Sequence, residues 1–342
     1  MHFLHRKEGY TLIVVLWALV ILSVIFINLV DEVSINGLLV YHNLEEKKIY
    51  QNTVSGIMQG INLLKNDKGD FDIEGEEFKK PIEFEVDGIN YQVKIKDIGN
   101  KLNINYAPFT ILSSYDWWNE NLKNKLVQEE LIPAISLFEK KIDANEKIKN
   151  KFTVYGEFNI NTDRLGSLEK ILAGLEVSNY EIDMIINFLK KQRQENKFIT
   201  VNDLQDLYLK GLSSSTLQRL KPHITSTGRI NINLVDEDIL SIIVNRAIKD
   251  SKKSEIITQK LLGFKKNNTV KEFAQLKKII NDEKSWQVIK NYFTTQSHFF
   301  LIEAKAFSVD SKELKQINCD VKRYKEDNGD LKVKILRWNE SR

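Results

Sequence analysis

The sequence predicts an α+β protein in which a long amino-terminal helix packs on an antiparallel sheet, with a helical domain inserted in the chain. Three observations predict this class. An uncharged apolar run at 10–30 leads into helix-compatible sequence that continues to about Leu64. Alternating apolar and polar residues at 82–95 and 299–335 are typical of strands. Between them, apolar residues recur at spacings of three and four, which is typical of helices.

The composition excludes several classes of protein. The 342 residues are 42% hydrophobic and 28% charged, and 50 basic against 47 acidic side chains leave a formal charge of +3. Because this composition is that of an ordinary globular protein, neither disorder nor a small disulfide scaffold is expected. The near balance of charge also gives no bulk attraction for nucleic acid, which usually needs a clustered basic face.

Cysteine and histidine provide no visible site. Cys319 is the only cysteine, which excludes an intramolecular disulfide and a zinc site with several thiolates, so we expect it to be buried as a small apolar residue. The histidines are His2, His5, His42, His223 and His298. None stands at the spacing of a metal site or a catalytic triad, so the sequence shows no residues for a hydrolytic site.

The run from Tyr10 to Val30 is long enough to cross a bilayer, because as a helix it covers roughly 31 Å. Arg6 and Lys7 precede it, and basic residues keep the short leader in the cytoplasm and place the rest outside. A secretory signal, a plain anchor and a processed leader are the possible interpretations. A secretory signal fits poorly, since its apolar core is shorter and ends in a small-residue cleavage site.

The residues around this junction separate the other two interpretations. Arg6-Lys7-Glu8-Gly9 before Tyr10-Thr11-Leu12 resembles the site where a prepilin peptidase cuts after glycine, so cleavage between Gly9 and Tyr10 is expected. Val14 would be the fifth mature residue, where most pilins and pseudopilins carry glutamate. An unpaired carboxylate in a membrane costs about 2.5–3.5 kcal/mol on insertion scales. The K-type minor pseudopilins of type II secretion normally lack this glutamate, as does any ordinary anchor.

The middle of the chain contains three Asn-Ile-Asn passages, at 103–105, 159–161 and 231–233. Their unequal spacing argues against a solenoid with one period. Each passage precedes a predicted helix, and asparagine readily accepts a hydrogen bond from the free amides of a first helical turn. Capping signals at Ser178 and Thr200 introduce further short helices, and Pro222 ends the last. This order resembles the helix-hairpin-helix or SAM-like modules of K-type pseudopilins.

Strands are predicted at both ends of this helical region. Asp87-Gly88 joins the alternating segments 82–86 and 91–95 as a hairpin. Segments 299–309, 317–321 and 331–335, with a turn at Asn328-Gly329, predict an antiparallel meander. Ser297-His298-Phe299-Phe300 and the ending Lys334-Ile335-Leu336-Arg337-Trp338 are similar to strands of the same family.

The resemblance to K-type minor pseudopilins therefore spans the whole chain. It implies a leader at 1–9, a membrane segment at 10–30, a first part of a pilin-like domain at 31–105, an inserted helical domain at 106–225 and a second part at 226–342. It also implies a non-enzymatic inner-membrane protein at the tip of the pseudopilus, processed by prepilin peptidase and methylated. The implied partners are the I-type and J-type minor pseudopilins, the major pseudopilin and secreted proteins.

Binding of DNA is the alternative function, because helix-hairpin-helix modules direct backbone amides at phosphate through a Gly-x-Gly hairpin. In Gly174-Leu175-Glu176 a glutamate replaces the second glycine, and Gly211-Leu212-Ser213 lacks that glycine too. A membrane-anchored DNA-uptake protein is then supported mainly by the basic run Lys190, Lys191 and Arg193. Such runs more often form a solvated helix face, so nucleic acid is not the expected partner.

Calcium is the one cofactor that the resemblance implies, and it needs six to eight oxygen ligands. Asp203 and Asp206 could contribute, as could the acidic run Asp236-Glu237-Asp238. An imperfect match to an acidic stretch of the family lies at Asp116-Trp117-Trp118-Asn119-Glu120. No ligand set is assigned. Trp117 and Trp118 could form a contact surface, but core packing of at least one ring is favoured.

Overall fold

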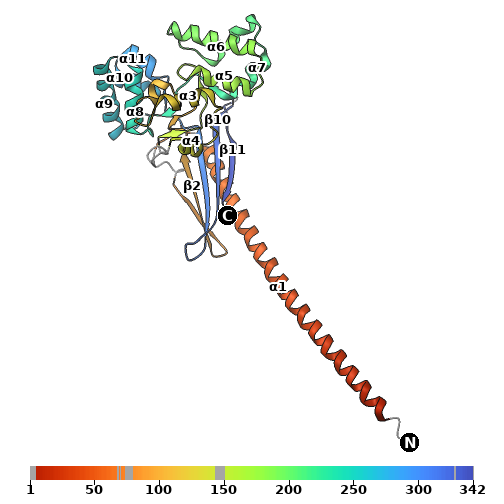
Figure 1. Ribbon diagram of the computed structural model, residues 1–342. Coiled ribbons are helices and arrows are strands. Elements are labelled where there is room, and N and C mark those ends of the chain that lie inside the picture. Colours follow the sequence, from red (N-terminus) through yellow and green to blue (C-terminus); the bar gives the residue numbers. More distant parts are fainter. Residues whose placement is uncertain are drawn as a thin grey trace.

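The computed structural model describes residues 5–67, 69, 71–73, 80–142, 151–326 and 329–341. Helix α1 (His5–Asn66) projects far from a folded body, with the amino terminus at its distant end and the carboxyl terminus at the base of the body (Figure 1). The last turns of α1 pack on a sheet, and helical lobes lie beyond that sheet. The predicted α+β class, with a long first helix on an antiparallel sheet, is confirmed.

The sheet has five strands in the order β1-β2-β9-β10-β11, and every neighbouring pair is antiparallel. Its strands are β1 (Ile82–Val86), β2 (Ile89–Asp97), β9 (Phe299–Phe307), β10 (Glu313–Lys325) and β11 (Leu331–Ser341). Asp87 and Gly88 have φ of 52° and 75°, as a tight hairpin requires. The predicted hairpin and meander are both confirmed. Asn328 lies outside the described residues, and Gly329 has φ of 88°.

Helix α1 approaches the sheet closely through two glycines. A Cβ atom at Gly56 would lie 2.7 Å from Val93 Cγ2, and one at Gly60 would lie 2.8 Å from Ile302 Cγ2. Because both neighbours are β-branched and stiff, only glycine allows this spacing. Cys319 is fully buried in the same core, as expected for a small apolar residue.

The three Asn-Ile-Asn passages begin three similar units. Their two-residue strands are β3 (Leu102–Asn103), β5 (Phe158–Asn159) and β7 (Ile230–Asn231). Each pairs in parallel with the strand that ends its unit, namely β4 (Phe152–Thr153), β6 (Ile224–Thr225) and β8 (Phe293–Thr294). The predicted helix follows each passage at the same distance, as α2 (Phe109–Leu112), α5 (Leu165–Gly174) and α8 (Glu237–Ala247).

The asparagines act differently from the predicted helix caps. In each passage the backbone N–H of the second asparagine donates to Oδ1 of the first, at 2.8–2.9 Å. The first asparagine is therefore occupied within its own turn, and the helices have other residues at the N-cap position, namely Pro108, Arg164 and Asp236. The expectation that these asparagines cap the helices is wrong.

The second asparagine of each passage clamps a distant loop. Asn105 Nδ2 donates to the carbonyl of Ile132 at 2.9 Å, and the N–H of Ile132 returns a bond to Oδ1 at 2.8 Å. Asn161 makes the same pair of bonds with Ile199, and Asn233 makes it with Val270. The segment between the second asparagine and the residue that it clamps is shorter in the first unit than in the other two. One motif therefore recurs without a fixed period.

The units form two cores rather than one. The first and third units share a core that runs from Leu102 to Phe138 and from Ile230 to Phe293, whereas the second has its own, from Phe158 to Ile224. The shared core contains α2, α3 (Glu120–Gln128), α4 (Ile135–Ile142), α8, α9 (Ser251–Asn267), α10 (Phe273–Ile280) and α11 (Glu283–Ile289). The second unit contains α5, α6 (Asn179–Gln194), η2 (Val201–Lys210), α7 (Ser214–Leu220) and η3 (Lys221–His223).

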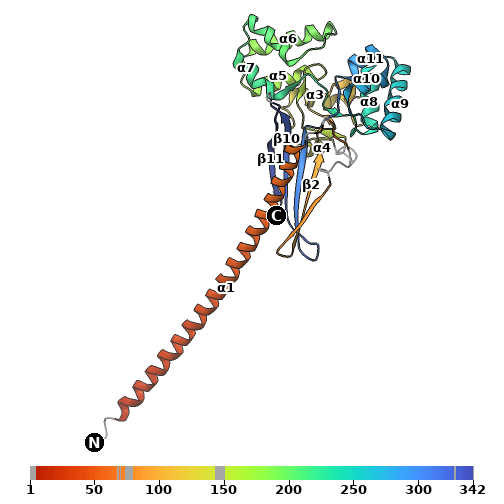
Figure 2. The ribbon, with the colours of Figure 1, turned by 180° about the vertical axis from the view of Figure 1, so that it is seen from behind.

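The two helical lobes lie side by side beyond the sheet (Figure 2). The range 106–225, predicted as the inserted helical domain, contains the whole second unit. Helices also fill most of 237–289, between that range and β9. They lie there because the third unit completes the core of the first. The exact domain limits stay a prediction.

Candidate functional site

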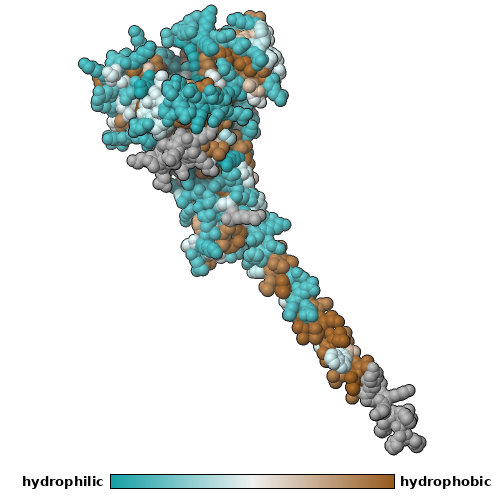
Figure 3. Space-filling model, viewed as in Figure 1, coloured by the Kyte–Doolittle hydropathy of each residue, from teal (hydrophilic) through white to brown (hydrophobic). Residues whose placement is uncertain are grey.

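The amino-terminal part of α1 is bare. Within the described residues one helix is long and apolar enough to cross a membrane, with a mean hydropathy of 3.0 over its most apolar 18 residues, and none of that stretch is buried. Large apolar side chains between Leu12 and Leu44 are exposed, from 45% at Val30 to 70% at Leu38 (Figure 3). This helix fits the predicted single-span anchor.

The apolar surface continues beyond the predicted membrane segment. Asp31 and Glu32 end the uncharged run, but Val33 is 62% exposed and Leu44 is 54% exposed. The first ion pair with the body joins Lys48 to Asp87 in the β1–β2 turn, at 3.7 Å. We call residues 31–47 the stalk, about 26 Å of helix. Within the described structure no other element covers it.

The predicted cleavage site lies in the first turns of α1, where the backbone of Gly9 and Tyr10 is helical. Their side chains are outside the described part, and cleavage between them stays a prediction. Val14 is 51% exposed on the bare helix, so this position presents methyl groups rather than a carboxylate.

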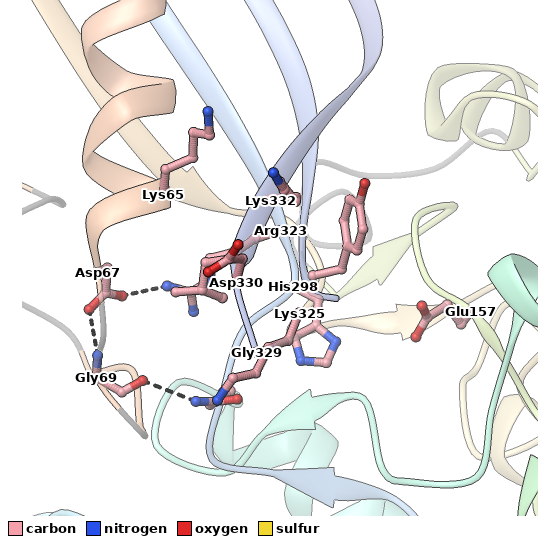
Figure 4. Close-up of a pocket in the computed structure, with 13 residues that line it drawn as sticks. Lys65, Asp67, Gly69, Glu157, His298, Arg323, Lys325, Gly329, Asp330 and Lys332 are labelled. Carbon is pink, nitrogen blue, oxygen red and sulfur yellow. Dashed lines mark hydrogen bonds and ion pairs between the residues drawn. The ribbon is translucent and has the colours of Figure 1, made fainter. Parts of the chain in front are cut away.

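A pocket of about 790 Å³ opens where α1 ends (Figure 4). At its floor Arg323, only 4% exposed, forms ion pairs with Asp67 and with Asp72, the latter at 2.7 Å. Burial lowers the pKa of His298, which keeps this pocket histidine neutral near pH 7. Because Asp67 follows α1 and Arg323 lies on β10, the cluster ties the end of the helix to the sheet.

Three of the acidic residues considered for calcium, Asp203, Asp236 and Asp238, have structural tasks. Asp236 caps α8 by accepting from the N–H of Asp238 at 2.9 Å, and Asp238 pairs with Lys151 at 2.5 Å. Asp203 forms a capping box with Thr200 at the start of η2. Across the part of the chain that the structure describes, no three His, Cys, Asp or Glu residues converge as a metal site. Binding of calcium stays a prediction without assigned ligands.

The two tryptophans are partly buried and pack against the shared core. The Trp117 ring lies 5.3 Å from Phe152 and 5.6 Å from Phe138, measured between ring centroids. The Trp118 ring lies 5.4 Å from Phe109. Core packing is thus confirmed, while Asn119 beside them caps α3 by accepting from the N–H of Leu122.

In the candidate phosphate-binding hairpin, a residue other than glycine adopts the left-handed backbone conformation that favours glycine. Glu176 has φ of 55°, so a side chain and a negative charge occupy the second glycine position. In the basic run only Lys190 and Lys191 are exposed. The guanidinium of Arg193 donates to the carbonyls of Ile160 at 3.0 Å and Asp163 at 2.7 Å. The run therefore offers two solvated lysines rather than a basic surface.

Three features were missed from the sequence. Gly56 and Gly60 have the spacing of a close helix contact, which was a readable signal. Arg323 occupies an inward strand position, two residues after the buried Val321, and a charge on the buried face of a strand signals an ion pair. Asp72 lies between the end of α1 and the start of β1, and nothing local indicates that Arg323 is its partner.

Comparison with known proteins gives a remote structural likeness. No family model and no curated protein matches the chain. The chain is similar to one in the crystal structure of the GspK-GspI-GspJ complex from the enterotoxigenic Escherichia coli Type 2 Secretion System. That chain is 14% identical, with a TM-score of 0.39, and the match covers 88% of this chain and 98% of that one. GspK, a component of that complex, is the kind of protein that the sequence resembles, while the fold is established by the elements of this chain.

Proposed function

We propose that this protein is a minor pseudopilin of a type II secretion system, a non-enzymatic subunit that assembles through α1 with related single-span proteins. The bare apolar stalk supports the proposal. A membrane would cover residues 10–30, but the exposed apolar side chains between Val33 and Leu44 lie beyond it. Burying one such side chain fully contributes about 1.5–3 kcal/mol. Packing against other helices is therefore the most favourable arrangement for the stalk.

The proposed place of the subunit is the tip of the pseudopilus in the inner membrane, where assembly begins. Val14 supports this position, because a subunit without the membrane carboxylate has nothing to pair with the amino terminus of a subunit above it. Most of the body lies beyond the end of α1, which suits a crowning position (Figure 1). The proposed neighbours are I-type and J-type minor pseudopilins, with the major pseudopilin below and secreted proteins as cargo.

Processing tests the proposal most directly. After co-expression with a prepilin peptidase, mass measurement should show that residues 1–9 have been removed and that the chain begins at Tyr10. A Gly9→Trp variant should keep its leader, because the residue at the cut is changed. An intact leader on the unaltered protein, in cells that process another prepilin, would contradict the proposal.

The DNA-uptake alternative makes the opposite prediction for nucleic acid. We expect the full chain in detergent micelles to show no steep, salt-dependent affinity for duplex DNA, because Glu176 blocks the hairpin and Arg193 is engaged internally. Fluorescence anisotropy with labelled DNA from 50 to 200 mM salt measures this. Binding that weakens steeply as the salt concentration rises, and that is tighter in the Glu176→Gly variant, would favour the alternative.

A further inference from the structure

Strand β11 is an edge of the sheet with two different faces. Within the described residues it pairs with β10 alone. Val333 lies opposite Arg323 and Ile335 opposite the buried Val321, so both point toward the α1 side. Lys332 and Lys334 alternate with them and point to the outer face. We call Leu331–Ile335, of sequence Leu-Lys-Val-Lys-Ile, the basic edge.

The outer face of the basic edge carries excess positive charge. Lys334 lies directly opposite Lys322 on β10, and like charges at such positions repel. Lys322 is paired with Glu157 at 2.5 Å, whereas Lys334 forms no ion pair within the described structure. Burial lowers the pKa of His223 nearby, Lys322 and Lys334 lower it further, and Glu157 raises it.

We propose that the basic edge receives an extended segment of another protein in which acidic and apolar residues alternate. Strand addition would satisfy the open main-chain groups of the edge and place acidic side chains beside Lys332 and Lys334. Lys332 already lies 3.8 Å from Glu326, but an exposed pair at that distance is weak and leaves the lysine able to bind a closer carboxylate. The apolar side chains would cover Ile335, which is 42% exposed.

A second copy of this chain does not fit the site, although its own β1 has the required pattern, Ile-Glu-Phe-Glu-Val. When the residue pairing is followed across the sheet from β1 to β10, Glu83 lies at the level of Gln316. Lys332 lies at the level of Tyr324 on the same strand. These levels differ by about 26 Å along the strands. Copies whose α1 helices span one membrane stand at equal height, so β1 of one cannot reach the basic edge of another.

Two features of the basic edge disfavour pairing with strands that are not acidic. Leu336 is an extra residue at a bulge between the pairs Asp320–Arg337 and Val321–Ile335. Bulges and lysines both discourage unselective pairing at sheet edges. A neutral or basic strand would meet these obstacles, whereas an acidic strand would gain from the lysines.

The test uses the full chain in detergent micelles and a labelled peptide of alternating glutamate and valine. Lys332→Glu with Lys334→Glu should weaken binding at least tenfold, and the corresponding glutamine pair should weaken it less. Lys190→Glu with Lys191→Glu, the same charge change on α6, should leave binding unchanged. A peptide of alternating lysine and valine should not bind. All changed lysines except Lys332 are well exposed, and circular dichroism checks that each variant folds.

Two measurements distinguish strand addition from charge attraction alone. Bound peptide should slow amide hydrogen exchange at 331–335, and replacing the peptide valines by proline should abolish binding. Equal binding by the proline peptide, no slowed exchange, or full binding to the glutamate pair would overturn the proposal. Self-association that the glutamate pair removes would assign the edge to a second copy and overturn it as well. None of these outcomes depends on processing after Gly9, so the proposed function is tested separately.

Discussion

At the scale of single residues, Glu176 is held in a conformation that suits glycine. A non-glycine residue in the left-handed region is disfavoured by roughly 1 kcal/mol, and Glu176 has φ of 55°. We therefore expect Glu176→Gly to raise the free energy of unfolding by about 0.5–1 kcal/mol, measured by urea denaturation of the full chain. Glu169→Gly, within α5, should lower it by about as much. Stabilisation by both changes, or by neither, would contradict this account.

The asparagine clamps give a second prediction for a single residue. Asn105→Ala removes both bonds to Ile132 and leaves a backbone N–H and a carbonyl unpaired in a buried loop. The expected loss of unfolding free energy is about 1–3 kcal/mol. Asn187→Ala on the exposed face of α6 is the matched control and should change stability little. Equal effects of the two changes would show that the clamp has no special importance.

At the scale of elements, the contact between α1 and the sheet depends on the absence of side chains. Gly60→Ala places a methyl group against Ile302, so either the helix or the strand must shift. We expect a loss of about 1–3 kcal/mol, seen as a lower urea midpoint. Gly37→Ala in the stalk has nothing within 4 Å and should leave the midpoint unchanged or slightly raised. An unchanged midpoint for Gly60→Ala would show that α1 packs less closely.

The start of α11 should make stability depend on pH. Hydrogen bonds from Lys253, at 2.8 Å, and from Ser285 hold the pKa of Asp282 below its ordinary value. A lowered pKa means that this stabilisation is complete above the unfolded pKa of about 3.9 and is lost as pH falls below it. Urea midpoints between pH 2.5 and 6 should therefore fall less steeply with acid in Asp282→Asn than in the unaltered protein. Parallel curves would exclude this contribution.

At the scale of the whole molecule, the stalk should affect assembly without affecting the fold. Leu38 is 70% exposed and contacts no part of the body. Leu38→Glu should leave the unfolding of the body unchanged but strongly reduce co-purification with the proposed I-type and J-type partners. Lys190→Glu, distant from the stalk, should reduce neither the stability of the body nor the co-purification. Co-purification that survives the Leu38 change would contradict helix packing through the stalk.

The sequence predicted the helices and strands better than the tertiary contacts between them. The uncharged run, the Asp87-Gly88 turn and the final alternating strands have local causes, so the long helix, the hairpin and the meander could be predicted. The asparagine clamps could not, because Asn105 and Ile132 are joined only by the tertiary fold. The same holds for Arg323, whose partners Asp67 and Asp72 lie at the opposite end of the folded body's sequence. The bare stalk was predicted only as a continuous helix.

The shared core of the first and third units has a consequence for synthesis. The first unit leaves the ribosome before the second, yet its interior is completed only by residues 230–293. At about 5–20 residues per second, its apolar residues wait on the order of ten seconds for their partners. The second unit can fold in the meantime, because it has its own core and its two ends pair with each other as β5 and β6. A nascent chain stopped after residue 228 should therefore hold one folded lobe and one unfolded lobe, and the unfolded lobe is where a chaperone would bind.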